Sequence, residues 1–136
     1  PDYNADDYSH IFDLGSQQII YGRATIDTSK TSSAYAESAT HDYYYGLINF
    51  SLGSNGKGVQ TFSSTPIVTV TATSSSSSST NDDIISTIYN VNNTSFNFRL
   101  FRAQQLLTRV NAKISPTPSP LPSGIVYLNW IAIGQK

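Results

Sequence analysis

The stretch that decides the fold lies near the end of the chain and reads Ile125-Val126-Tyr127-Leu128-Asn129-Trp130-Ile131-Ala132-Ile133-Gly134. Because successive side chains of a strand point to opposite sides, this stretch is apolar on both faces. One face carries Val126, Leu128, Trp130 and Ala132, and the other carries Ile125, Tyr127, Ile131 and Ile133. A strand of an antiparallel sheet normally has water on one side. Either another part of the chain or another copy of it covers the second face. Since 136 residues form about one domain with one core, we favour a second copy.

Five further segments have the β-branched and aromatic composition of strands. They are residues 18–27, 43–52, 58–73 with a turn at Pro66, 84–91 and 95–102. No window shows a helical period with a cap. The sequence therefore predicts an all-β fold, an antiparallel β-sandwich of six strands, or seven if the segment around Pro66 counts as two.

The domain is expected to span residues 16–136. Residues 1–15 are rich in Asp, Tyr, Asn and Ser without a period, which predicts a linker or neck segment. The chain begins at Pro1 and contains no methionine, so we expect it to be a piece of a longer protein whose remainder precedes it.

Charge and composition narrow the kinds of partner. Eight basic and nine acidic residues are scattered along the chain, so it lacks the basic patch that binds nucleic acid or anionic lipid. The chain has no cysteine, which excludes disulfides and thiolate chemistry. Abundant Ser and Thr together with nine tyrosines favour neutral, hydroxyl-rich ligands, although a plain β scaffold has the same composition.

The sequence argues against an enzyme. Ser54-Asn55-Gly56-Lys57 fits the pattern of serine-lysine acylases, but that motif opens a helix, whereas Asn-Gly here indicates a hairpin. Glu37 is the only glutamate, and His10 and His41 lie in separate segments without a partner at a useful spacing. We therefore expect no catalytic residue, no metal site and no cofactor.

Candidate ligand contacts lie where strands meet loops, because loops present binding residues on a rigid support. The candidates are His41, Asp42, Tyr43, Asp82, Asp83, Arg102 and Gln104. Each has a simpler alternative: a solvated strand end, a polar turn, or an edge residue that guards against strand addition. Tyr43 and Tyr45 share one face and Tyr44 the other, so at least one of these tyrosines belongs to the core. Trp130, in the middle of an apolar run, is expected in the core rather than against a sugar.

The second half of the chain resembles the H-type lectin pattern, which recurs in receptor-binding heads of bacteriophage tail fibres. The matching fragments are Val59-Gln60-Thr61-Phe62, Thr65-Pro66-Ile67-Val68-Thr69-Val70, Ile88-Tyr89-Asn90-Val91, Thr94-Ser95-Phe96-Asn97-Phe98 and Leu128-Asn129-Trp130-Ile131-Ala132-Ile133-Gly134. The resemblance implies a six-stranded sandwich that forms a homotrimer through one sheet, which predicts Tyr127, Ile131 and Ile133 as interface residues. It also implies glycan binding at the outer end or at subunit junctions.

The binding residues of those lectins are not conserved here. Asp83 stands where the lectins have an arginine, and Ala103-Gln104 where they have Trp-His. This departure favours a phage head on a tail fibre or baseplate, extracellular at the virion tail tip, that binds a host surface polysaccharide without membrane insertion. The alternatives are a structural trimerisation domain without its own ligand and a cellular H-type lectin.

Overall fold

The computed structural model describes residues 8–27, 35–37, 43–51, 61–74, 84–102 and 125–136. These residues form eight strands and no helix. The strands are β1 (Tyr8–Asp13), β2 (Gln17–Asp27), β3 (Tyr35–Glu37), β4 (Tyr44–Asn49), β5 (Ile67–Ser74), β6 (Ile84–Tyr89), β7 (Ser95–Arg102) and β8 (Ile125–Gln135). The predicted all-β class is confirmed.

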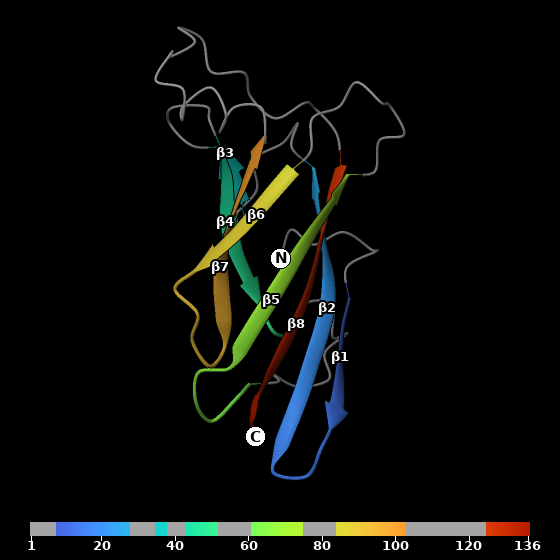
Figure 1. Cartoon of the computed structure of the whole chain (residues 1–136), viewed down its shortest axis with the longest axis vertical. Helices are drawn as coiled ribbons and strands as arrows, with labels where there is room; N and C mark the ends of the chain where they lie inside the picture. Colours follow the sequence, from blue (N-terminus) through green and yellow to red (C-terminus); the bar gives the residue numbers. More distant parts are fainter. Residues whose placement is uncertain (1–7, 28–34, 38–42, 52–60, 75–83, 103–124) are drawn as a thin grey trace, which may run out of the picture.

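The strands form two antiparallel sheets that lie face to face (Figure 1). The first sheet has the order β1-β2-β8-β5 and the second has the order β3-β4-β7-β6. Each contains three of the predicted strands and one additional strand at its edge. In the first sheet, β8 pairs with β2 from Ile125 to Gln135 and with β5 from Val126 to Ile133.

The core lies between the sheets, and alternation along the strands places its side chains there. Val126, Leu128, Trp130 and Ala132 of β8 are all buried, as the sequence predicted. Trp130 meets Phe96 of β7 and Phe50 just after β4, with ring centroids 5.9 and 5.7 Å apart. Phe62 closes the cluster edge-to-face against Phe50 at 5.2 Å. These aromatic contacts join the two sheets, since they link side chains from both.

The other face of β8 is exposed, as its sequence suggested. Ile131 and Ile133 expose 48% and 41% of their surface. No described segment packs over these two side chains.

The structure has two strands that were not predicted, and part of one predicted strand segment is not a strand. Part of the predicted linker is wrong, because Tyr8–Asp13 forms β1 and pairs along its whole length with β2. The turn between them has Gly15 at φ 89°, where its amide donates to Oδ1 of Asp13 at 2.8 Å. The three-residue strand β3 was also missed. In the predicted segment 58–73, residues 61–66 lie outside any strand, so it supplies only β5, and residues 58–60 lie outside the described residues.

Candidate ligand-binding surface

Arg99 lies at the centre of the outward-facing positions of the second sheet. It pairs with Tyr45 of β4 on one side and with Thr87 of β6 on the other. The next outward row towards the start of β7 contains Asn97, which pairs with Leu47 and Tyr89. The next outward row towards the end of β7 contains Phe101, which pairs with Ile85. Directly opposed residues on one face have Cβ atoms about 5 Å apart, so these side chains are neighbours.

Aromatic rings surround the Arg99 guanidinium. Its central carbon lies 4.2 Å from the centre of the Tyr89 ring and 5.6 Å from that of Tyr43. Tyr43 in turn contacts Phe101, with centroids 5.5 Å apart, and meets Tyr45 edge-on at 6.0 Å. We call these five residues, Tyr43, Tyr45, Tyr89, Arg99 and Phe101, the aromatic–arginine surface.

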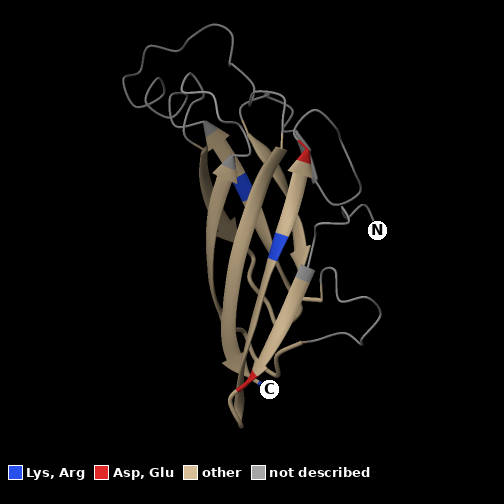
Figure 2. Cartoon of the chain, turned by 90° about the vertical axis from the view of Figure 1, so that its right-hand side faces the viewer, with Lys and Arg blue, Asp and Glu red and all other residues tan. Residues whose placement is uncertain are grey.

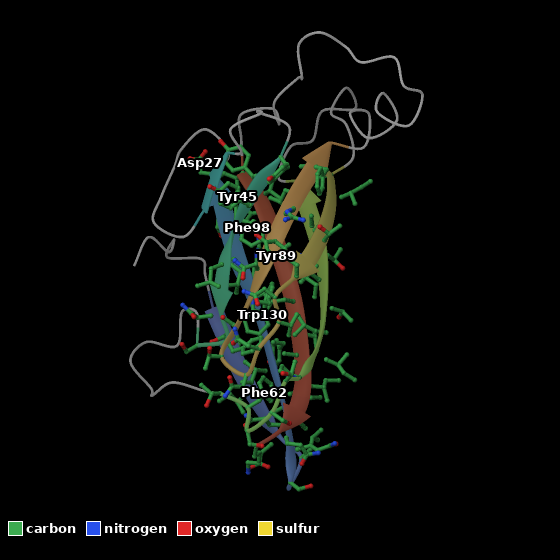
Figure 3. The ribbon with its side chains drawn as sticks, turned by 90° about the vertical axis from the view of Figure 1, so that its left-hand side faces the viewer. Asp27, Tyr45, Phe62, Tyr89, Phe98 and Trp130 are labelled. Carbon is green, nitrogen blue, oxygen red and sulfur yellow. The ribbon has the colours of Figure 1, made fainter. Side chains whose placement is uncertain are left out.

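The alternation of the strands explains why these side chains point outward. Tyr44 is buried in the core, so its neighbour Tyr45 faces water with 39% of its surface exposed. In β7, Phe98 and Leu100 are buried and Arg99 between them faces outward. Figure 3 shows Tyr45 and Tyr89 in the half of the molecule nearer Asp27, while Trp130 and Phe62 lie towards the other end. The aromatic side chains of this surface are therefore held by the paired strands β4, β6 and β7.

Polar groups border this surface at the turn from β6 to β7. Asn90 has a positive φ of 53° and donates from Nδ2 to Oδ1 of Asn97 at 3.3 Å. Oδ1 of Asn92 accepts from the backbone amides of Thr94 and Ser95, both at 2.9 Å. Asn97 is directly opposite Tyr89, and its amide nitrogen donates no hydrogen bond to a described residue.

Comparison with protein-family models, with curated proteins and with solved structures finds no match.

One of the predicted ligand contacts belongs to this surface. Tyr43 is part of it, half-buried against Phe101. Arg102 ends β7 opposite Ile84, so its backbone lies at the same end of the sheet as Tyr43. His41, Asp42, Asp82, Asp83 and Gln104 lie outside the described residues.

Sequence reasoning missed Tyr45, Tyr89 and Arg99 as candidate contacts. The signal was present in the alternation, because Arg99 lies between Phe98 and Leu100 and must face away from the core. The pairing register between β4, β6 and β7 was needed to show that these three residues meet.

The outer face of the first sheet has a different character. One row runs across all four strands and consists of Phe12, Ile19, Ile133 and Ile67. Phe12 and Ile67 are 60% and 75% exposed. The next row begins with His10 and Tyr21, whose rings lie 5.5 Å apart, and continues to Ile131 and Thr69. We call the face formed by these two rows the apolar face.

Next to the apolar face the sheet becomes polar. The Arg23 guanidinium lies 3.5 Å over the ring of Tyr127, and its Nε is buried without a hydrogen-bond partner. Asn129, opposite Arg23, donates to Oγ1 of Thr73 at 3.3 Å. A shallow hollow of about 240 Å³ lies over Asn129, between Tyr21, Ile131 and Thr69. Of the predicted interface residues, Ile131 and Ile133 are exposed, whereas Tyr127 is half covered.

Charged residues are sparse on the described strands (Figure 2). Near the C-terminus, Nζ of Lys136 donates to Oδ2 of Asp13 at 2.6 Å. This hydrogen bond, with a second one from the Gly15 amide, lowers the pKa of Asp13 below its usual value of 3.8. Among the described residues, no group of three or more potential metal-ligating side chains occurs, and no helix is long and apolar enough to cross a membrane.

Proposed function

We propose that the chain is a non-enzymatic receptor-binding head of a bacteriophage tail fibre or baseplate protein, which binds a host cell-surface saccharide. The aromatic–arginine surface is the observation that carries this proposal. It gathers the exposed ring of Tyr45 and three half-buried aromatic rings with hydrogen-bond donors on the outer side of a sheet. Aromatic side chains that pack against one another and are not enclosed in the core are typical of a recognition surface.

The chemistry of the surface suits a sugar. A pyranose ring has an apolar C–H face that packs on an aromatic ring, and hydroxyl groups at its rim that need hydrogen-bond partners. Tyr45 offers the exposed ring, while Arg99 and Asn97 lie beside it with N–H donors. Because such a flat contact buries little area, we expect a dissociation constant of about 0.1 to 1 mM per site, raised by several copies on one virion.

We further propose that the head is a homotrimer on the N-terminal remainder of a fibre or baseplate protein, located at the tail tip. The apolar face supports self-association, because a row of four apolar side chains crosses the whole first sheet and is open to water. The same observation supports the alternative of a structural trimerisation domain, in which a neighbouring domain contacts the host. Two antiparallel sheets are in keeping with an H-type lectin-like sandwich in either case.

The test is binding of the labelled domain to a panel of bacterial strains, each measured before and after its surface polysaccharide is stripped. We expect strain-selective binding that is lost on stripping. Tyr45→Ala should weaken it by removing the exposed ring, whereas Tyr45→Phe, the matched control, keeps the ring and should retain most of it. A domain that forms the trimer but binds no strain would contradict saccharide recognition and favour the structural role.

A further inference from the structure

The guanidinium of Arg99 is held in place but is not neutralised. In the described part of the chain it forms neither an ion pair nor a hydrogen bond, and its contacts are the rings of Tyr89 and Tyr43. None of its nitrogen atoms is buried without a partner, so they reach solvent. The rings therefore fix the position of the cation and leave its donors free.

Arg23 on the first sheet shows what an arginine without this role looks like. It too lies over a tyrosine ring, at 3.5 Å from the centre of Tyr127, but its Nε is buried and has no partner. Arg99 lies at greater distances from its rings, 4.2 and 5.6 Å, and none of its nitrogens is buried without a partner.

No described carboxylate compensates Arg99 on the outer face of the second sheet. The ion pair in the described residues joins Asp13 to Lys136 in and beside the first sheet. The described residues that share the outward rows with Arg99 are aromatic, aliphatic, hydroxyl or amide side chains. Among the described residues of these outward rows, Arg99 is therefore the charged side chain.

We propose that Arg99 selects an anionic saccharide by binding its carboxylate or phosphate group while the sugar ring packs on Tyr45. The planar guanidinium matches both oxyanions with two parallel N–H···O bonds. Tyr45 and Arg99 are directly opposed across β4 and β7, so a ring on Tyr45 places its substituents within reach of the cation. This inference rests on the proposed saccharide binding and replaces the neutral ligand that composition favoured.

The test compares matched ligands by calorimetry on the intact chain. One pair is a uronic-acid oligosaccharide and its carboxyl-reduced form; the other is an oligosaccharide with a phosphate monoester substituent and the same oligosaccharide after phosphatase treatment. We expect the acidic member of one pair to bind about tenfold or more tightly than its neutral counterpart, because hydrogen bonds between charged groups are stronger than those between neutral groups. The pair that shows the preference identifies the oxyanion, and added salt should reduce that preference.

Variants then locate the preference. Arg99→Gln should abolish it, so that the acidic and the neutral member of the pair bind equally, and Arg99→Lys should keep part of it. Tyr45→Ala should weaken the acidic and the neutral ligand alike. Arg23→Gln, the matched control on the other sheet, should leave the preference intact. Circular dichroism and thermal melting confirm that each variant is folded, and the salt dependence of the wild-type chain provides a test that needs no variant.

The outcomes separate the two proposals. Equal affinity for acidic and neutral members, with binding still sensitive to Tyr45→Ala, overturns the role of Arg99 and leaves saccharide binding standing. A preference that survives in Arg99→Gln, or disappears in Arg23→Gln, assigns the anion to another site and also overturns it. Absence of binding to every saccharide and every strain overturns both.

Discussion

Gly134 lies where β8 passes closest to the residues that precede β5. A Cβ atom at this position would lie 2.9 Å from Cδ1 of Phe62 and 3.0 Å from Cβ of Pro66. Both neighbours are buried and cannot easily move away. We predict that Gly134→Ala lowers the free energy of unfolding by about 1–3 kcal/mol, as other overpacked sites do. Denaturant unfolding measures this, and an unchanged midpoint would show that the Phe62 ring has room to shift.

The hydrogen bond between Lys136 and Asp13 predicts a pH dependence. Since the pKa of Asp13 is lowered in the folded chain, its contribution to stability is present above the ordinary value of 3.8 and is lost as pH falls through the folded pKa. Asp13→Asn should therefore lower the melting temperature at pH 7 and have no such effect at pH 2. Lys136→Gln should remove most of the same difference. A melting temperature that is insensitive to both substitutions at pH 7 would contradict this role.

At this scale the sequence was informative about which side of a strand a residue occupies. Trp130 is in the core as predicted, and Tyr44 is the one of the three neighbouring tyrosines that is buried, where the sequence predicted at least one. The contacts of Arg99 with Tyr89 and Tyr43 could not be predicted in the same way, because they depend on the register of three strands that lie far apart in sequence.

The hairpin of β6 and β7 depends on one side chain in its turn. Oδ1 of Asn92 accepts hydrogen bonds from the amides of Thr94 and Ser95 at 2.9 Å, and from the Thr94 hydroxyl at the same distance. We predict that Asn92→Ala destabilises the fold by about 1–2 kcal/mol, because it leaves these donors without the partner. Asn92→Asp keeps the acceptor and should be close to wild type in urea unfolding. Equal stability of Asn92→Ala and wild type would show that water replaces the side chain without cost.

The two strands that sequence analysis missed are both at sheet edges. β1 has the sequence Tyr-Ser-His-Ile-Phe-Asp, whose polar residues resemble a linker, and β3 has only three residues. Edge position alone does not explain the difference, because β5 and β6 are edge strands too and their β-branched and aromatic residues predicted them. The six strands with strong β-branched or aromatic composition were all predicted at nearly the observed positions, apart from the segment before Pro66.

For the whole molecule, the apolar face predicts self-association. Ile131→Asp and Ile133→Asp would each place a charge in the proposed contact, and we expect light scattering to show single chains where the wild type shows three copies. Ile85→Asp is the matched control, because Ile85 is similarly exposed on the other sheet. A wild-type chain that is already monomeric, or Ile131→Asp folded with unchanged mass, would contradict the interface.

Only part of the apolar face could be predicted from the sequence. The two-faced character of β8 was visible in its residues, but the row that continues through Ile19 to Phe12 and through Ile67 required the pairing of four strands. Phe12 in particular lies in a segment that looked like a linker. The pattern of a single strand does not show which partner would cover this face.

The central claim is that the aromatic–arginine surface binds a saccharide, and the most direct test is NMR titration of the isotopically labelled chain. The ligand is a surface oligosaccharide prepared from a strain that the domain binds. We predict that the largest amide shifts fall in β4, β6 and β7 around Tyr45, Tyr89 and Arg99. Shifts confined to β1, β2, β5 and β8, or to the segments that connect the strands, would contradict the claim.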